Sequence, residues 1–390
     1  MVNIFPSNTP SVEDVLYGDR TTSYRWEVFS HANGVDHLVG VLDGVFEGSL
    51  SWTYNTSVKG TGKATLIDLD VVDTTPGLLR VADLTLESVR LRPVQVIQGL
   101  PENPLGIFLV SAADEDWEDT GRTYALELLD KCTVLDQDLV DESYSVAAGT
   151  KILPTVQAIV ASAGEYLAID ASVTTAVSTG QVWDAGTSKL NIINDLLSIA
   201  GYSALWMDGY GNFQATPSQL PADRDLSYAL LGLPRELRDG EQSIYSPSWT
   251  RTKDSYSVPN KVLAIQAAGG TDDPAIVGEW TNQDPTSPYS YQSRGRWITY
   301  VVDGVEVPDG TAATQLAFLQ SRAQTTLVQM SAVQASIKLT HLPIPLVIGD
   351  VLQFSNTDAG IDTQYQATSM ALDTTSTGLM KTTLQEVISL

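Results

Sequence analysis

The most regular hydrophobic pattern of the chain lies in its middle, within residues 186–217. Apolar side chains recur there at spacings of three and four residues, at Leu190, Ile193, Leu197 and Ala200. This spacing gathers them on one face of a helix and leaves residues such as Asn191 on the wet face. Gly201 follows at the position where glycine commonly ends a helix in the left-handed conformation.

The residues after Gly201 have the pattern of a small hairpin. Two short segments, residues 204–207 and 213–215, flank the sequence Asp208-Gly209-Tyr210-Gly211-Asn212. Its two glycines supply the positive φ values that a tight reversal needs. The sequence therefore predicts a compact helix–hairpin unit with strand-rich segments on both sides.

The N-terminal third alternates between apolar and polar residues over short runs, as strands do. These runs lie at residues 24–30, 39–42, 46–54, 63–69, 89–94, 104–110 and 123–130. Turn residues separate them, which favours a sandwich or a barrel. Residues 1–20 contain Pro6 and Pro10 and are predicted to form an arm, with one helical turn starting near Ser11.

The pattern changes near residue 140. An apolar stripe at Leu153, Val156, Ile159 and Val160 predicts a helix. Small residues at 171–178 predict a loop, and the prolines and mixed charges of residues 218–245 predict irregular structure.

The C-terminal part is predicted to be strand-rich again, with one long helix at residues 311–330. The helical stripe consists of Ala312, Leu316, Leu319, Ala323, Leu327 and Met330, and Asp309 or Thr311 is the expected cap. Strands are predicted at residues 256–265, 298–302, 335–339, 347–354, 365–372 and 379–387. No repeat of fixed period occurs, which argues against solenoids and propellers.

These elements predict a β-rich α+β chain with a short arm and three larger parts. The arm covers residues 1–20, a β-rich domain covers 21–140, an inserted α+β module covers 141–250, and a second β-rich domain with the long helix covers 251–390. A chain of 390 residues is expected to fold as two to four domains.

Charge is the sharpest feature of the composition. There are 22 lysines and arginines against 47 aspartates and glutamates, a formal net charge of −25. Such a chain should repel DNA, RNA and anionic membranes. The alternative interpretation is that the acidic residues only keep the protein soluble.

The N-terminus has no signal-peptide pattern, and no apolar run approaches the length of a membrane span. We therefore expect a soluble protein made in the cytoplasm.

The residue types that carry catalysis or bind metals form no motif in this sequence. His31, His37 and His341 match no metal-binding spacing, and the first two flank a turn at Asn33-Gly34, so both are expected in loops. The acidic run at residues 114–119 lacks the EF-hand spacing and is expected to be an exposed loop. No G-x-S-x-G motif occurs, and Cys132, the only cysteine, is expected to be buried in a strand and cannot form an intrachain disulfide. The sequence thus predicts no catalytic residue, no cofactor-binding residue, no metal ligand and no cofactor.

The ordered set of short motifs resembles the tail-hub proteins of long-tailed phages, the baseplate-hub or tail-associated minor tail proteins of phages of actinobacteria. In the N-terminal part the motifs are Leu91-Arg92-Pro93, Pro104-Leu105-Gly106-Ile107-Phe108, Gly121-Arg122-Thr123 and Leu129-Asp130-Lys131. In the middle they are Val146-Ala147-Ala148-Gly149-Thr150, Lys189-Leu190-Asn191, Ile193-Asn194-Asp195-Leu196-Leu197, Gly201-Tyr202 and Leu205-Trp206-Met207-Asp208. In the C-terminal half they are Val258-Pro259-Asn260-Lys261-Val262, Ser293-Arg294-Gly295-Arg296, Gly349-Asp350-Val351 and Met380.

This resemblance implies two β-barrel-like tube domains per subunit, an inserted α+β module, and a homotrimer that closes a ring continuing the tail tube. It implies a structural protein of the virion tail tip. Family members often carry an enzymatic extension after the hub, and the sequence departs from this pattern because it ends at Leu390 after the predicted last hub strand, so we expect a non-enzymatic protein. The implied partners are the distal tail protein ring, the tape measure protein and tip or receptor-binding proteins. DNA would pass an acidic lumen without specific binding.

Two other functions remain open on the sequence alone. A tail-tip cell-wall hydrolase would need two catalytic carboxylates, and the acidic residues single out no pair. A carbohydrate-binding adhesin would use the eight tryptophans and fifteen tyrosines, although such residues more often fill β cores and protein interfaces. The basic pairs Arg90/Arg92 and Arg294/Arg296 are too few for a nucleic-acid site.

Overall fold

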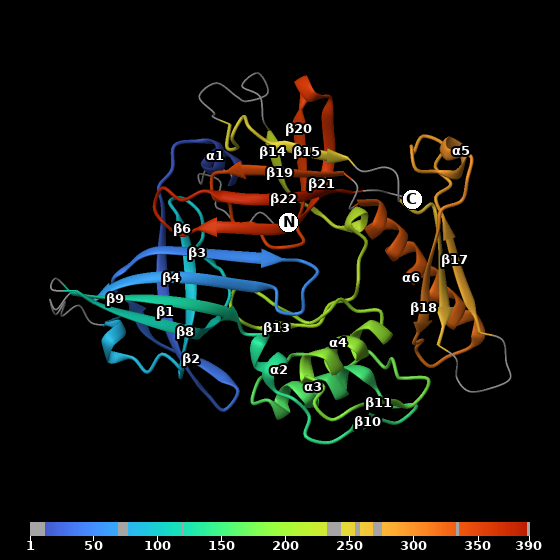
Figure 1. Cartoon of the computed structure of the whole chain (residues 1–390), viewed down its shortest axis with the longest axis horizontal. Coiled ribbons are helices and arrows are strands. Elements are labelled where there is room, and N and C mark those ends of the chain that lie inside the picture. The colour runs from blue at the N-terminus through green and yellow to red at the C-terminus, as the bar shows by residue number, and fades with distance from the viewer. Residues whose placement is uncertain are drawn as a thin grey trace.

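The computed structural model describes residues 12–68, 77–118, 121–231, 243–253, 258–267, 275–332 and 335–387. One extended sheet dominates these residues, with the helix–hairpin module below it and a long helix with three strands beside it (Figure 1). None of the described helices is long and apolar enough to span a bilayer.

The N-terminal part begins with a short helix and continues as strands. Its elements are α1 (Val12–Tyr17), β1 (Thr22–Ala32), β2 (Val35–Leu42), β3 (Val45–Thr53), β4 (Gly60–Asp68), β5 (Leu78–Leu79), a 3₁₀ turn (Val81–Asp83), β6 (Val89–Ile97), β7 (Asn103–Pro104), β8 (Phe108–Glu118) and β9 (Gly121–Asp130). The helical turn predicted near Ser11 is α1, whose Leu16 and Tyr17 are buried in the core of the second half.

The middle of the chain is the module that the hydrophobic pattern predicted. It comprises α2 (Thr133–Gln137), β10 (Tyr144–Val146), α3 (Ile152–Ser162), β11 (Gln181–Trp183), α4 (Lys189–Ile199), β12 (Trp206–Met207) and β13 (Phe213–Gln214). The predicted stripes of α3 and α4 are confirmed, because Val156, Val160, Leu190, Ile193 and Leu197 are all buried in one core. The module therefore folds around its own apolar centre.

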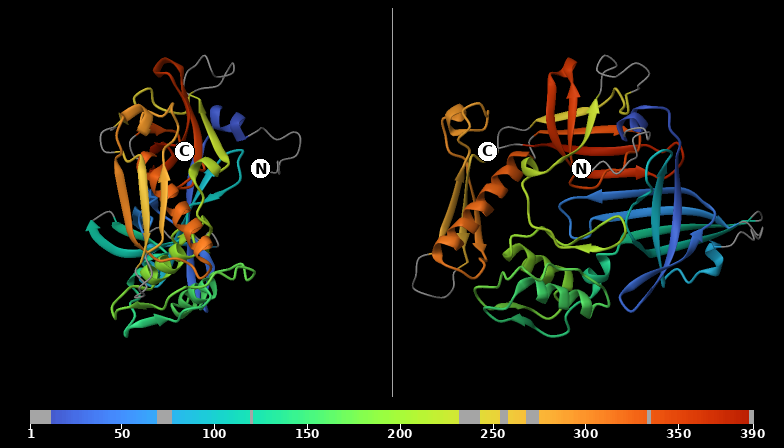
Figure 2. Two further views of the ribbon diagram at one scale, coloured as in Figure 1. Left: turned by 90° about the vertical axis from the view of Figure 1, so that its right-hand side faces the viewer. Right: turned by 180° about the vertical axis from the view of Figure 1, so that it is seen from behind.

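The C-terminal half contributes strands to the large sheet and, between β15 and β19, forms a separate sheet of three strands. Its elements are a 3₁₀ turn (Pro221–Asp223), β14 (Leu226–Leu231), β15 (Thr250–Lys253), β16 (Lys261–Gln266), β17 (Val277–Thr281), α5 (Tyr291–Arg294), β18 (Thr299–Val305), α6 (Ala312–Ala332), β19 (Ala335–His341), β20 (Val351–Asn356), a 3₁₀ turn (Thr357–Ala359), β21 (Ile361–Asp373) and β22 (Met380–Glu386). The long helix predicted at residues 311–330 is α6. It covers one face of the separate three-stranded sheet β17-β16-β18 (Figure 2).

The prediction of two barrel-like tube domains needs correction. The described strands form no closed barrel. Fifteen of them join one sheet, ordered β15-β19-β22-β21-β3-β4-β9-β8-β6-β1-β2-β5 along its main path. Strand β21 of the second half pairs with β3 of the first, Met370 opposite Trp52. The two halves keep separate hydrophobic cores on the inner side but share a single hydrogen-bonded sheet.

Three local predictions were also wrong. The irregular stretch predicted at 218–245 contains β14, which pairs in parallel with β20, and its residues 232–242 lie outside the described part of the chain. The acidic run from Asp114 to Glu118 belongs to strand β8, because β9 supplies a partner for each residue. Cys132 precedes helix α2 rather than standing in a strand, although it is buried as predicted.

Candidate functional site

The helix–hairpin unit is held together by polar side chains at each junction. Ser188 caps α4 by accepting from the backbone N–H of Asn191, and Gly201 follows the helix with φ of +76°. Asn194 on the helix accepts from the backbone N–H of Leu205, which ties the hairpin to the helix at 2.9 Å. This hydrogen bond joins the hairpin directly to the helix.

The hairpin turn is closed by the Asp208 carboxylate. Its oxygens accept from the backbone N–H groups of Tyr210 and Asn212, both at 2.9 Å, and from the side chains of Asn212 and Gln214. These donors occupy the carboxylate, and the turn joins two strands rather than opening a helix. Gly211 has the predicted positive φ, +91°, whereas Gly209 does not, and a Cβ at Gly209 would instead collide with the carbonyl oxygen of Pro104. The turn forms no phosphate cradle.

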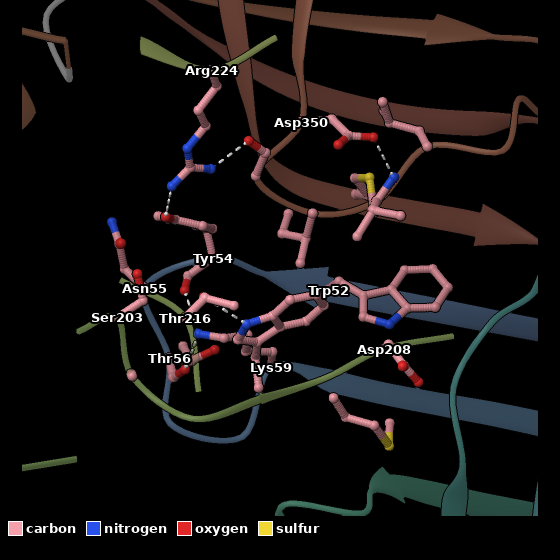
Figure 3. Close-up of a pocket in the computed structure, with 18 of the residues that line it drawn as sticks. Trp52, Tyr54, Asn55, Thr56, Lys59, Ser203, Asp208, Thr216, Arg224 and Asp350 are labelled. Carbon is pink, nitrogen blue, oxygen red and sulfur yellow. Dashed lines mark hydrogen bonds between the residues drawn. The ribbon is translucent and has the colours of Figure 1, made fainter. Parts of the chain in front are cut away.

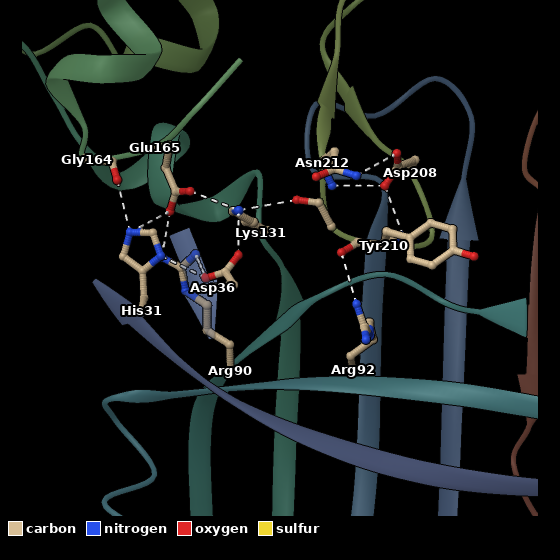
Figure 4. Close-up of polar contacts among 11 residues, drawn as sticks. His31, Asp36, Arg90, Arg92, Lys131, Gly164, Glu165, Asp208, Tyr210 and Asn212 are labelled. Atoms are coloured by element: carbon tan, nitrogen blue, oxygen red, sulfur yellow. Dashed lines mark hydrogen bonds and ion pairs between the residues drawn. The ribbon is translucent and has the colours of Figure 1, made fainter. Parts of the chain in front are cut away.

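A buried ion network fastens the module to the sheet (Figure 4). Glu165, in the loop after α3, accepts from Arg90 of β6 at 2.6 Å and pairs with Lys131, after β9, at 2.9 Å. Asp36 of β2 accepts from the same Arg90 at 2.7 Å and Lys131 at 2.8 Å. The Glu165 side chain is 0% exposed, so these charges depend on one another for solvation.

The charges in this network shift the Asp36 carboxyl toward its ionised form. Burial alone would raise the pKa of Asp36, but the hydrogen bond and charge of Lys131, together with Arg90, hold the pKa below its ordinary value. Lys131 also donates to the backbone carbonyl of Gly211 in the hairpin at 3.2 Å. The network thus contacts both the loop after α3 and the hairpin.

His31 belongs to the same network, which corrects the prediction that His31 and His37 are loop residues. They lie in β1 and β2, on either side of the Asn33-Gly34 turn. The Nδ1 atom of His31 is 2.7 Å from Asp36, and Nε2 is 3.0 Å from the carbonyl of Gly164. Both partners are hydrogen-bond acceptors, so the ring connects Asp36 of β2 to the loop after α3.

His31, Asp36 and Glu165 also present ligand atoms within 4.8 Å of one another, the arrangement of a metal site. The guanidinium of Arg90 and the ammonium of Lys131 already lie against both carboxylates, however. A divalent cation would have to displace or approach these two fixed positive charges. The donor set therefore suits an internal ion network better than a metal.

Arg92 stands between the sheet and the hairpin tip. Its guanidinium lies 4.4 Å from the ring centre of Phe29 and 5.9 Å from that of Tyr210, and it pairs with Glu27. The basic pair Arg90/Arg92 is thus used inside the fold rather than displayed to a nucleic acid. Arg294, of the second basic pair, donates to the carbonyl of Val258 and lies over Tyr289.

The module also contacts the unit that contains α6. The backbone N–H of Asp309 donates to the carbonyl of Ala176 at 2.9 Å, and Ser178 donates to the carbonyl of Val307 at 2.6 Å. These contacts lie in the small-residue loop that was predicted at 171–178. The sheet, the module and the α6 unit therefore enclose a common space.

That space is a cleft of about 1020 Å³ (Figure 3). Aromatic residues Trp52, Tyr54, Tyr202 and Trp206 line it, and Arg322 of α6 borders it. Several of the polar groups that line it bond to one another: Arg224 donates to the Gly349 carbonyl and the Tyr54 hydroxyl, and Trp206 donates to Thr216. None of the three histidines lines the cleft, so no described hydroxyl or thiol there is paired with an imidazole base.

The cysteine that borders the cleft, Cys132, is poorly suited to act as a nucleophile. Burial raises the pKa of the Cys132 thiol well above its ordinary value, and the neighbouring Asp130 adds to this effect. A protonated thiol is a poor nucleophile. Cys132 accordingly serves the module core rather than catalysis.

His341 is a buried titratable residue in the core of the second half, and it predicts how stability depends on pH. Its Nε2 lies 2.8 Å from the Thr382 hydroxyl, and burial lowers its pKa to about 4. Between about pH 6.5 and pH 4 the unfolded chain binds a proton that the folded chain excludes, so stability falls as the pH falls, by up to about 3 kcal/mol. Urea unfolding at about pH 7 and pH 4.5 should show this loss, and His341→Gln should reduce it.

His37 provides the matched control, because it is exposed on β2. The His37→Gln variant should keep the full pH dependence of the natural chain. An unchanged pH dependence in His341→Gln would show that the buried imidazole does not cause it.

Solved structures that share the fold of this chain include tail proteins. It resembles the tail protein from Neisseria meningitidis MC58, with a TM-score of 0.60, 13% identity, and coverage of 93% of this chain and 97% of that one. It also resembles the 43 kDa tail protein of prophage MuSo2 from Shewanella oneidensis, with a TM-score of 0.58, 11% identity, and coverage of 93% and 98%. A chain of the lidless PdpA–VgrG complex matches with a TM-score of 0.54 and 9% identity, over 99% of this chain and 67% of that one.

No protein-family model matches the sequence, and no curated protein matches it. At these identities the similarity establishes the fold. The chain shares the β-rich fold of these tail proteins over 93% of its length.

Proposed function

We propose that this chain is a structural, non-enzymatic tail-tip hub protein of a phage virion. The observation that carries the proposal is the match in fold to two tail proteins over more than nine-tenths of both chains. The site chemistry agrees with it, since the buried ion network and the hydrogen bonds of Arg224 in the cleft join different parts of the fold. The similarity to a chain of the PdpA–VgrG complex favours the hub among tail proteins.

In this proposal three copies close a ring that continues the tail tube. The ring connects the distal tail protein ring and the tape measure protein to tip or receptor-binding proteins, and DNA passes through its acidic lumen. The assignment to a phage of an actinobacterial host rests on the sequence motifs alone. Loops at 209–245 and 267–292 are proposed for partner contacts, and their residues 232–242 and 268–274 lie outside the described part of the chain.

Mass photometry of the purified chain tests the proposed assembly. We expect trimers, either of the chain alone or after it is mixed with its ring partner, because a trimer would cover sheet edges that a single copy leaves open. Mass spectrometry of purified particles should find the chain in the virion. A chain that stays monomeric with its neighbouring tail proteins, or that is absent from particles, would contradict the proposal.

A further inference from the structure

The cleft between the sheet, the helix–hairpin module and α6 has an aromatic wall. Trp52 lies on β3 and Tyr54 directly follows this strand, while Tyr202 and Trp206 belong to the segment after α4. All four side chains are half-buried, so part of each ring remains open to solvent. Figure 3 shows Trp52 and Tyr54 among the side chains that line this space. The cleft therefore offers accessible aromatic surface from two parts of the fold.

Helix α6 gives the same cleft a polar wall. The apolar stripe of this helix is buried against the three-stranded sheet. Its cleft-lining residues recur at spacings of three and four, which places them together on another side of the helix: Arg322, Thr325 and Gln329. Arg322 and Gln329 are exposed, and neither forms a hydrogen bond or an ion pair with a described residue. These side chains can therefore bind a ligand without breaking a contact of the fold.

Other residues of the cleft also have polar groups that no described residue uses. The side-chain oxygen of Asn194 accepts from the backbone N–H of Leu205, which leaves the Nδ2 amide of Asn194 free to donate. The indole N–H of Trp52 donates to no described residue. Asn55, next to Tyr54, is exposed and likewise unpaired among the described residues. Unused donors and acceptors thus lie beside the aromatic rings.

The charge of the cleft argues against a polyanionic ligand. Three basic and five acidic side chains line it: Lys59, Arg224, Arg322, Asp130, Asp208, Asp223, Asp225 and Asp350. Proteins that hold a nucleic acid do so mainly by neutralising its phosphates with lysine and arginine. An excess of carboxylates repels such a polymer, so an uncharged ligand suits this cleft better.

We propose that this cleft binds a neutral oligosaccharide. A pyranose ring has a flat face of C–H groups that packs on an indole or phenol ring, and its hydroxyls exchange hydrogen bonds with amide, hydroxyl and guanidinium groups. The volume of about 1020 Å³ lies at the upper end of the roughly 300–1,000 Å³ that ligand sites usually have, so several linked sugar rings fit. The polar wall of α6 is less suited to a protein segment, because the centres of protein interfaces are depleted in charged residues.

Calorimetric titration of the purified full chain with four neutral tetrasaccharides tests this inference: chitotetraose, cellotetraose, maltotetraose and mannotetraose. We expect at least one of them to bind. Trp206→Ala should weaken that binding about tenfold, because one stacking contact is lost. Trp206 packs into none of the four hydrophobic cores of the described residues, so the variant is expected to fold. Ser203→Leu adds volume inside the cleft without removing a ring and should also weaken binding.

Trp117→Ala is the matched control, because this indole is 67% exposed on β8 and does not line the cleft. It should bind the saccharide as the natural chain does. A tetralysine peptide is titrated in parallel, since the carboxylates of the cleft could instead attract a basic protein segment. If Trp206→Ala fails to fold, Ser203→Leu decides the matter in the same way.

Three results would overturn the inference. They are the absence of binding by all four saccharides, binding of tetralysine alone, and equal saccharide affinity in the cleft variants and in Trp117→Ala. The inference goes beyond the proposed hub function and does not depend on it. The titrations use the isolated chain, whereas the hub function is tested by trimer formation and by the presence of the chain in particles, so either can fail without the other.

Discussion

Replacing Glu165 with glutamine is expected to lower the free energy of unfolding by about 3–5 kcal/mol. The substitution keeps the shape of the side chain but removes a fully buried negative charge that faces Arg90 and Lys131. Asp36 would then be the one carboxylate left between two buried cations. Thermal and urea unfolding of the purified variant would measure the loss.

Two further variants test this expectation: one breaks an exposed ion pair, and the other removes a positive charge from the buried network. Glu127→Gln breaks the exposed pair with Lys63 and should cost less than about 1 kcal/mol. Adding Lys131→Met to Glu165→Gln leaves Arg90 opposite Asp36 and should recover part of the loss, which a double-mutant cycle quantifies. Equal effects of Glu165→Gln and Glu127→Gln would mean that the network does not hold the module to the sheet.

Replacing Phe354 with alanine is expected to destabilise the second half of the sheet by about 3–5 kcal/mol. Phe354 on β20 is fully buried, and its ring lies 5.1 Å from that of Tyr245, 5.8 Å from Trp249 and 6.2 Å from Tyr365. Removing it opens a cavity at the point where β20, β21 and the segment before β15 meet. Chemical denaturation should show the loss, and amide hydrogen exchange should increase first in β20 and β21.

Phe46 on β3 supplies the control for this substitution. Its side chain is 46% exposed, so Phe46→Ala removes the same atoms without leaving a buried cavity. We expect its cost to stay within about 1 kcal/mol. A Phe354→Ala variant as stable as Phe46→Ala would show that the aromatic cluster does not support the sheet.

The sequence determined the elements whose burial follows a local period. Each of the helices α3, α4 and α6 lies where the pattern placed it. In α6 the predicted stripe is buried at Leu319, Ala323 and Leu327, but Ala312 and Leu316 at its start are exposed. The hairpin after Gly201 was predictable as well, because Gly211 and Asp208 specify the reversal within five residues. In such elements the deciding interactions lie within one or two turns of the chain.

Only the tertiary structure decided how these elements are joined. Strand β14 was missed because its flanking prolines and charges suggest a loop, and β20, more than a hundred residues later, supplies its partner. The union of the halves depends on β21 pairing with β3, and the buried network gathers His31, Asp36, Arg90, Lys131 and Glu165 from five separate segments. The spacing of apolar residues along a helix or strand indicates which side of that element is buried, but not which other element covers that side. Which strands pair, and which charged residues come together, depends on side chains that meet only after the chain has folded.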